Sequence, residues 1–428
     1  MGVILLLSLQ FQTLPIQIQV QTLPLTTVFA VIFFPFVIGR TPRSPLLTML
    51  ILFLSFALLH SLVALMVDLL SGQSDNRFVA WLRQSSGLTA GVIVFLVFRM
   101  VFLHLSYDQI SRWIMIGALP AIGLSLLNIV WGALGKEWAG AIVTGIRDVV
   151  SPDGYTAPLR ASGFASEPAA WATSLVVTVL PVLLVHLSLK KRSIWVVLFL
   201  IASGLAFAWT FSTIGLMLLV AVLILGTLLG PRRKLLLVFF SSFILLLSLA
   251  FVAFPGNQIL RHARSLALGQ ANQSFTDRYY SAFGPFIETF DSYSIIGYGL
   301  GGVSTHYREV VPTVVQTELF STKWKDYPNL TIITGRIFAE TGAIGFVLFL
   351  FVMFLTFREL KTIMRRNKNP ESDIILSSIR LGWIAVCVSV FISIGPYQTP
   401  YLWLWMAFID SRYVMSNASQ VKMEANVG

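Results

Sequence analysis

The chain has 428 residues, of which 56% are hydrophobic and 11% are charged, and its mean hydropathy is +0.80. Soluble domains carry about 25% charged residues, so this composition excludes an ordinary soluble domain, and the apolar content excludes intrinsic disorder. The formal net charge of +11 therefore has to be interpreted by where the basic residues lie, and we expect no nucleic-acid partner. The single cysteine, Cys387, excludes an intrachain disulfide.

Eleven segments are apolar and long enough to cross a bilayer as helices, which takes about 20 residues. They are residues 23–39, 45–70, 87–105, 113–135, 168–188, 193–210, 212–230, 235–254, 338–357, 374–395 and 397–415. Residues 1–12 are apolar but short, and they predict an irregular twelfth helix rather than a cleaved signal peptide. The predicted fold is an all-α polytopic membrane protein with about 11–12 transmembrane helices.

Basic residues are unevenly divided between alternate loops. Sixteen of the 30 Lys and Arg residues lie in one set of short loops and in the C-terminal tail, which the positive-inside rule assigns to the cytoplasm. The opposite set contains two long segments, 136–167 and 255–337, and loops of that length usually have a function. We therefore divide the chain into N-terminal transmembrane helices (1–254, with loop 136–167), a large helical extracytoplasmic loop (255–337), and C-terminal transmembrane helices with a cytoplasmic tail (338–428).

The first long loop ends with Arg160-Ala-Ser-Gly-Phe-Ala-Ser-Glu-Pro168. Pro168 favours the first turn of a helix, and Glu167 suits the positive end of that helix, although Glu167 is also a candidate catalytic carboxylate. Arg160 has no such helical role. At a membrane surface it is suited to bind a phosphate, and the alternative is a solvated arginine or a contact with a lipid headgroup.

The second long loop combines arginines, aromatic residues and glycines. Arginine suits an anion and aromatic rings suit a sugar, so the run Asp277-Arg278-Tyr279-Tyr280 predicts contacts to a phosphorylated glycan. Further candidates for substrate binding are Arg261 and Arg264. The alternating glycines from Gly297 to Gly301 predict a tight turn with close backbone approach, and a nucleotide-binding interpretation lacks the required βαβ context.

Three more residues of this region are candidates for chemistry. His306 is suited to act as a general base, or it is an exposed residue without a role. Arg336 and Glu340 have the i,i+4 spacing of a helical ion pair at a membrane entrance. Such a pair is either functional, with Arg336 binding substrate and Glu340 in catalysis, or a self-satisfied salt bridge.

Two motifs are missing from the sequence. No cluster of His, Asp and Glu has the spacing of a metal site, and no phosphate-binding loop for ATP is present, so we expect neither a metal nor another cofactor. A reaction without ATP needs a pre-activated substrate. Arginines that face outward from a membrane predict a lipid-linked phosphate or diphosphate as that substrate.

The order of these features resembles the Wzy-type polysaccharide polymerase and O-antigen ligase superfamily. The matching motifs are Arg160-Ala-Ser-Gly-Phe with Glu167-Pro168, Trp209-Thr-Phe-Ser-Thr-Ile-Gly215, Asp277-Arg278-Tyr279, Gly297-Tyr-Gly299-Leu-Gly301 and Ala339-Glu340-Thr-Gly342-Ala-Ile-Gly345. They cover about residues 160–345. Each motif is loose, and their order around one large late loop is more specific.

The resemblance implies a bacterial inner-membrane glycosyltransferase of the C-type membrane fold that works at the periplasmic face without a metal. Its implied substrate is an undecaprenyl-diphosphate-linked oligosaccharide in the lipid membrane, with a chain-length regulator protein as a further partner. A polymerase of the family transfers the growing glycan to a new lipid-linked repeat unit, in lipopolysaccharide or related polysaccharide biosynthesis. The implied diphosphate-binding residues are Arg160, Arg278 and Arg336.

This sequence departs from the family pattern in one place. Many members, ligases especially, have a His-Asn pair about nine residues before Glu-x-Gly, where this chain has Thr331 and Ile332. The general base is therefore left open among Glu340, Glu167 and His306, and the missing histidine favours a polymerase. An O-antigen ligase that transfers glycan to lipid A-core stays the alternative, and a lipid-linked glycan transporter is the alternative of another class.

Overall fold

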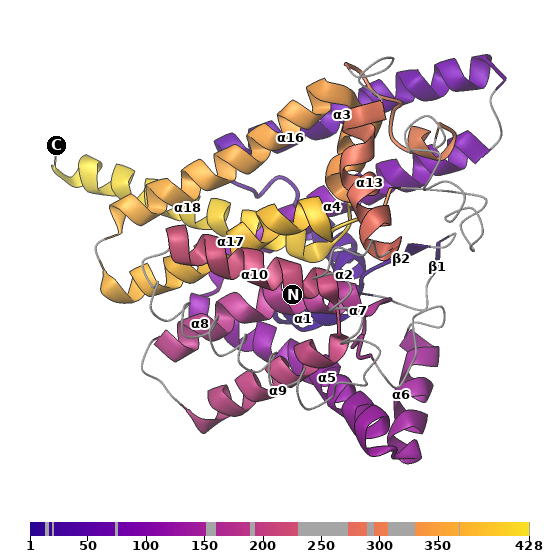
Figure 1. Cartoon of the computed structure of the whole chain (residues 1–428). Coiled ribbons are helices and arrows are strands. Elements are labelled where there is room, and N and C mark those ends of the chain that lie inside the picture. Colours follow the sequence, from indigo (N-terminus) through magenta and orange to yellow (C-terminus); the bar gives the residue numbers. More distant parts are fainter. Residues whose placement is uncertain are drawn as a thin grey trace. The chain divides into compact units, whose positions relative to one another are not determined.

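The computed structural model describes residues 1–12, 17–18, 21–72, 76–150, 160–188, 193–229, 273–288, 295–306, 330–367 and 369–427. These residues form helices, apart from one antiparallel pairing of β1 (Gln17–Ile18) with β2 (Gln21–Thr22), in the register Gln17–Thr22 and Ile18–Gln21 (Figure 1). The chain divides into two compact units, each made of three separate stretches of sequence. Their bounds are Met1–Phe29, Leu105–Gln273 and Arg366–Ser389 for unit 1, and Ala30–His104, Ser274–Arg365 and Val390–Gly428 for unit 2.

Unit 1 is built around the helix α5 (Tyr107–Leu134), which begins at a capping box formed by Ser106 and Gln109. Its other elements are α1 (Gly2–Leu7), η1 (Ser8–Gln10), α6 (Glu137–Val150), α7 (Pro168–Ser174), the π-helical turn η3 (Leu175–Val179), α8 (Leu180–Ser188), α9 (Ile194–Thr210), α10 (Thr213–Leu229) and most of α17 (Pro370–Ile392).

The core of unit 1 is apolar and centres on Trp171. This side chain is fully buried among residues of α5, α7, η3 and α9, and its indole N–H donates to Ser125 Oγ at 3.1 Å. A buried indole needs such an acceptor, because an unpaired polar group is costly in an apolar interior. The predicted helix start at Pro168 is confirmed, with Pro168 in the first turn and Glu167 at the N-cap position.

Unit 2 contains the long helices α3 (Pro45–Leu70), α4 (Asn76–His104), α16 (Ile333–Arg366) and α18 (Pro400–Val427). It also contains η2 (Phe34–Phe36), α13 (Gln273–Glu288) and η5 (Gly302–Ser304), and the helix α2 (Leu25–Phe33) crosses the unit boundary. Ser44 caps α3 by accepting from Leu47 N, and Pro45 occupies the first turn. Helices α4 and α18 pack closely against each other along the unit.

The helix α16 is interrupted at Gly342, whose backbone has φ +64° and ψ −170°. That conformation is open to glycine and breaks the helical hydrogen-bond ladder. The loop after residue 294 fills the gap: Tyr298 N donates to Ala339 O at 2.9 Å, and Ile344 N donates to Ile295 O at 3.4 Å. A Cβ at Gly342 would overlap the backbone of Ile295. The break therefore joins a loop to the first turns of α16.

The predicted membrane character is confirmed, because six helices within the described ranges are long and apolar enough to cross a membrane. They are α3, α4, α5, the continuous run Pro168–Leu187, α16 and α17. Three predicted spans correspond to shorter apolar helices, namely Leu25–Phe36, Ile194–Thr210 and Thr213–Leu228. The predicted span 397–415 lies mostly in α18, which is not one of the six, and the span 235–254 lies outside the described residues.

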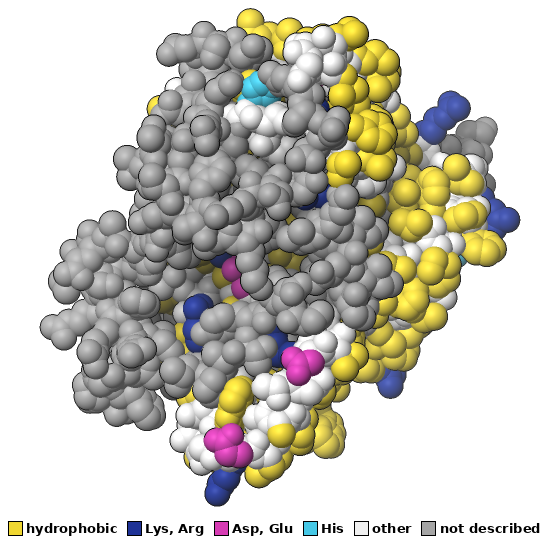
Figure 2. Space-filling view, turned by 90° about the vertical axis from the view of Figure 1, so that its right-hand side faces the viewer, with side chains coloured by type: hydrophobic (Ala, Val, Ile, Leu, Met, Phe, Trp, Pro, Cys, Tyr) yellow, Lys and Arg dark blue, Asp and Glu magenta, His cyan; other side chains and the backbone are white. Residues whose placement is uncertain are grey.

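The surface of the described residues also has the character of a membrane protein. Broad areas of the described surface are apolar, with Lys and Arg side chains scattered between them (Figure 2). On α3, Leu59 is 66% exposed and Leu70 is 88% exposed, and on α9, Trp195 is 75% exposed. Soluble monomers rarely expose apolar patches of such extent, whereas lipid tails solvate them at no cost. The described structure is that of an all-helical polytopic membrane protein.

Candidate functional site

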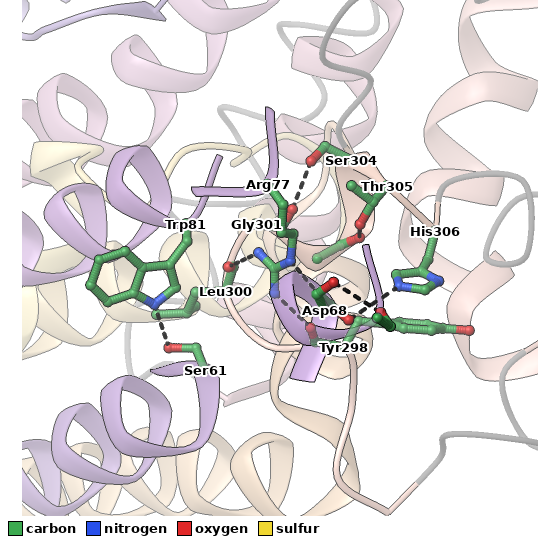
Figure 3. Close-up of polar contacts among 12 residues, drawn as sticks. Ser61, Asp68, Arg77, Trp81, Tyr298, Leu300, Gly301, Ser304, Thr305 and His306 are labelled. Atoms are coloured by element: carbon green, nitrogen blue, oxygen red, sulfur yellow. Dashed lines mark hydrogen bonds and ion pairs between the residues drawn. The ribbon is translucent and has the colours of Figure 1, made fainter. Parts of the chain in front are cut away.

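The strongest polar cluster of unit 2 surrounds a loop of glycines between residues 295 and 306 (Figure 3). Gly297, Gly299 and Gly301 all have φ between +75° and +79°. The close backbone approach predicted from their spacing is confirmed, because a Cβ at Gly301 would overlap the backbone of Ala80 in α4. We call this segment the glycine loop.

Arg77 at the start of α4 anchors the glycine loop. Its side chain is fully buried, and it donates to Leu300 O at 2.9 Å and to Tyr298 O at 3.0 Å. Its third donor, Nε, forms an ion pair with Asp68 Oδ2 of α3 at 2.6 Å. Three elements therefore meet on one guanidinium, which Figure 3 shows pointing into the turn of the loop. Arg77 and Asp68 are not among the site residues predicted from the sequence.

Glu340 anchors the glycine loop from the other side. The carboxyl is fully buried, Oε1 accepts from Gly301 N at 2.9 Å, and Oε2 accepts from Tyr397 Oη at 2.6 Å. The charges of Arg336 and Glu340 interact as their spacing predicts, but no direct ion pair within 4.0 Å joins these two described side chains. The break at Gly342 brings the loop to Glu340, whose two oxygens accept from one donor in the loop, Gly301 N, and from one outside it, the Tyr397 hydroxyl.

Arg336 is also buried, at 4% exposure, and its partners come from three places in unit 2. It donates to Leu330 O and to Gln84 Oε1 of α4, and its guanidinium lies 5.7 Å from the ring centre of Tyr397. Its Nε has no hydrogen-bond partner among the described residues. Arg336 therefore belongs to the protein interior around Glu340. A contact between Arg336 and a substrate stays a prediction.

His306 lies at the end of the glycine loop and is partly exposed. Its ring stacks on Tyr298 with the ring centres 4.5 Å apart, and its Nε2 lies 4.0 Å from Asp68 Oδ1. The carboxylate of Asp68 thus faces both Arg77 and His306, as the close-up shows (Figure 3). An imidazole oriented by a carboxylate is a common arrangement for a general base.

The helix α13 carries the predicted aromatic motif. Tyr279 is 45% exposed, and its ring packs against Tyr280 and Phe283 with centre distances of 5.5 and 5.2 Å. Arg278 on the same turn is partly exposed. Helix α13 packs on the start of α16, because Phe286 stacks on Phe338 at 4.2 Å. The fold of unit 2 therefore brings the motif to the same end of α16 as Glu340 and the glycine loop.

The other two predicted catalytic residues belong to unit 1. Arg160 donates to Thr210 O at 3.1 Å and to Phe211 O at 3.4 Å, so it binds the carbonyl end of α9. That end carries the negative part of the helix dipole, and Arg160 has the helix role that its sequence position did not reveal. Glu167 is exposed at the N-cap of α7 and makes no side-chain capping bond.

Arg147 of α6 is a buried residue that the sequence analysis did not select. Its guanidinium donates to Ser162 Oγ, to Gly163 O at 3.3 Å and to Ala165 O at 3.3 Å. Burial lowers the pKa of Arg147 to about 10. Arg147 therefore holds the segment that follows Arg160 in place, and its guanidinium stabilises the fold of unit 1.

Two predicted residues, Arg261 and Arg264, lie outside the described residues. Within the described part of the chain, no three His, Cys, Asp or Glu side chains form a group that could hold a metal ion. No protein-family model matches this sequence, and no curated protein matches it either. Fold and site together define an all-helical polytopic membrane protein with a buried polar cluster beneath a glycine loop.

Proposed function

We propose that this chain is a polysaccharide polymerase that transfers a growing lipid-diphosphate-linked glycan to a new lipid-linked repeat unit. The observation that carries the proposal is the grouping, at one end of α16, of a partly exposed histidine, a carboxylate facing it, and a helix that presents arginine beside tyrosines. The basic loops of the opposite membrane face support an extracytoplasmic location for this end in a bacterial inner membrane.

In the proposed reaction His306 is the general base. It accepts the proton of the acceptor hydroxyl as that oxygen bonds to the anomeric carbon, and the bond from that carbon to the lipid diphosphate breaks. Asp68 stabilises the protonated imidazole, since its carboxylate faces the ring. Glu340 is less suited to be the base, because both of its oxygens accept hydrogen bonds from within unit 2.

Arginine and tyrosine side chains have separate roles in the proposed reaction. Arg278 binds the departing diphosphate, and the exposed ring of Tyr279 packs on a sugar. Tyr280 supports that ring edge-on. Arg336 is a positioning residue for Tyr397, whose hydroxyl donates to Glu340. The phosphate contact of Arg160 stays a prediction from the sequence.

The test is a reaction of the purified full chain with a synthetic lipid-diphosphate repeat unit, without metal, nucleotide or lipid A-core. A ladder of products on a gel is the expected result. Transfer only after lipid A-core is added would mean a ligase, and movement of the intact lipid-linked glycan across vesicles without transfer would mean a transporter. Either outcome would overturn the polymerase proposal.

Arg278→Ala is the first variant to compare in this assay. We expect it to remove the ladder while thermal unfolding stays unchanged, because Arg278 is partly exposed. The matched control is Arg358→Ala, which removes an exposed arginine near the other end of α16 and should leave the ladder intact. A full ladder from Arg278→Ala would show that this residue does not bind the diphosphate.

A further inference from the structure

A second buried charge cluster lies in unit 2, away from the glycine loop. It contains Glu359 of α16, Asp410 of α18 and Arg99 of α4, beside the beginning of α3. Glu359 is 1% exposed, and the side chains of Arg99 and Asp410 are not exposed at all. Neither the reaction proposed above nor the predicted site residues use these three groups. We call Glu359 and Asp410 the carboxyl pair.

The two carboxyl groups have different neighbours. Asp410 forms an ion pair through Oδ2 with Arg99 Nε, and Arg99 also donates to Pro42 O at 2.6 Å. Glu359 faces the carboxyl of Asp410 and the backbone amide of Leu46 in the first turn of α3. The charged groups that face Glu359 are therefore Asp410 from α18 and Arg99 from α4, with a backbone dipole from α3.

Several polar atoms of this cluster have no hydrogen-bond partner within the described structure. They are both carboxyl oxygens of Glu359, Oδ1 of Asp410 and NH2 of Arg99. Fully ionised, the three side chains would carry two negative charges and one positive charge in a buried place. An excess buried charge is costly, and so is each unpaired polar atom. The cluster is therefore incomplete without a further positive charge.

A proton is the simplest source of the missing positive charge. Two carboxyl groups in contact can hydrogen bond only when one of them carries a proton, and paired buried carboxyls commonly share one. One added proton also makes the net charge of the three side chains zero. A metal ion is a poorer fit, because Arg99 already brings a positive charge and no third acidic, histidine or cysteine ligand joins the pair among the described residues.

We propose that Glu359 and Asp410 form an intramembrane proton-binding site, with the proton on Glu359 and Asp410 ionised beside Arg99. The proton belongs on Glu359, because the ion pair with Arg99 stabilises the charged form of Asp410. The site lies near the ends of α4 and α16 at His104 and Arg366, where Arg358 and Lys361 on the same stretch of α16 are exposed. The proton therefore exchanges with the membrane face that the basic loops mark.

Infrared spectroscopy of the purified full chain tests where the proton is. We expect a carbonyl band of a protonated carboxylic acid at neutral pH that shifts in heavy water and disappears in Glu359→Gln. The control is Glu371→Gln, which changes an exposed glutamate at the start of α17 and should keep the band. An unchanged band in Glu359→Gln would overturn the proposal.

Thermal unfolding of the same variants provides a second readout that does not depend on polymer formation. Glutamine mimics a protonated glutamate, so Glu359→Gln should unfold within a few degrees of the parent at neutral pH. The parent should become less stable as the pH rises and Glu359 loses its proton, and Glu359→Gln should not show this decrease. Asp410→Asn should unfold far lower, because it leaves Arg99 buried without its counter-ion. Equal destabilisation by both variants, or failure of Glu359→Gln to fold, would contradict a protonated Glu359.

A comparison of salts separates a proton from a metal cation. At one fixed pH, the unfolding temperature should be the same in sodium chloride and in choline chloride of equal concentration, because choline is too large to enter a buried carboxyl pair. A rise specific to sodium that disappears in Glu359→Gln would assign the site to a metal cation and overturn the proton proposal.

Discussion

The glycine-loop cluster and the carboxyl pair are built on the same helices of unit 2 but near opposite ends of them. Arg77 and Arg99 are 22 residues apart in α4, which corresponds to about 33 Å of helix. Glu340 and Glu359 are separated by 19 residues of α16, or about 28 Å. The hydrocarbon core of a bilayer is about 30 Å thick. The separation of the two clusters along these helices is therefore about one membrane thickness.

The two clusters differ in how their charged side chains are balanced. Arg77 uses its donors on two backbone carbonyls and on Asp68, and both oxygens of Glu340 accept hydrogen bonds. In the second cluster, the carboxyls of Glu359 and Asp410 face each other and share one buried cation, Arg99. Paired charges with hydrogen-bonded oxygens fix a local architecture, whereas a buried pair of carboxyls with one cation is left with an excess negative charge. Buried charges thus hold the glycine loop in the first cluster, and in the second cluster they favour the binding of a proton.

The largest expected effect comes from removing one counter-ion in each cluster. Asp410→Asn should cost about 3–5 kcal/mol, because it leaves the fully buried Arg99 without its ion pair. Asp68→Asn should cost clearly less, since Asp68 is 15% exposed and Arg77 keeps two carbonyl acceptors. Urea unfolding of both variants in the same detergent measures the difference. Equal losses would show that the two ion pairs contribute alike and would end the distinction.

The next effect concerns the break in α16. Gly342→Ala should cost about 2–3 kcal/mol, because alanine rarely adopts φ +64° with ψ −170° and its Cβ would overlap the backbone of Ile295. The control is Gly123→Ala in α5, where no atom lies within 4 Å of the added Cβ. That variant should gain about 0.5–1 kcal/mol from helix propensity. Thermal unfolding of both variants checks the opposite signs, and a neutral Gly342→Ala would mean that the loop does not depend on the break.

A smaller effect is expected for Tyr397→Phe, which removes one donor to Glu340. The loss should be about 1–2 kcal/mol, because the buried Oε2 of Glu340 then has no partner while Oε1 still accepts from Gly301 N. Chemical unfolding measures the loss. The double variant with Glu340→Gln should show non-additivity, since the two side chains share one hydrogen bond. Additive losses would indicate that the Tyr397 hydroxyl contributes little to holding Glu340.

The two clusters could be predicted from the sequence only where the contacts join residues that are close together in the chain. The alternating glycines predicted a tight turn, and Pro168 predicted a helix start, because both are local backbone effects. The i,i+4 spacing predicted that Arg336 and Glu340 interact, and their charges do so, but it contains no information about the break at Gly342 or about Tyr397, which together give Glu340 its hydrogen bonds. Long apolar segments likewise predicted the membrane helices without showing how those helices are grouped into units.

Arg77 and Asp410 were missed for the same physical reason. The carbonyl partners of Arg77 lie more than 220 residues away in the sequence, and Asp410 and Arg99 are 311 residues apart. A signal was nevertheless present, because each charged side chain inside or beside an apolar segment needs a partner. Asp68, Arg99, Glu359 and Asp410 all have that position. A search for charged residues in or beside the apolar segments would therefore have found members of both clusters.

The smallest effect on stability is expected at His306, where the proposed function predicts the largest effect on activity. His306→Gln should change the free energy of unfolding by about 1 kcal/mol, because the contacts described for the ring are a stack on Tyr298 and a 4.0 Å contact with Asp68. The same variant should reduce the rate of ladder formation at least about 100-fold, as loss of a general base does. Because stability and activity are predicted to respond so differently, one variant separates a supporting side chain from a reacting one. A rate within a few-fold of the parent, at unchanged stability, would assign His306 to the framework of the glycine loop and leave Glu340 and Glu167 as the remaining candidates for the base.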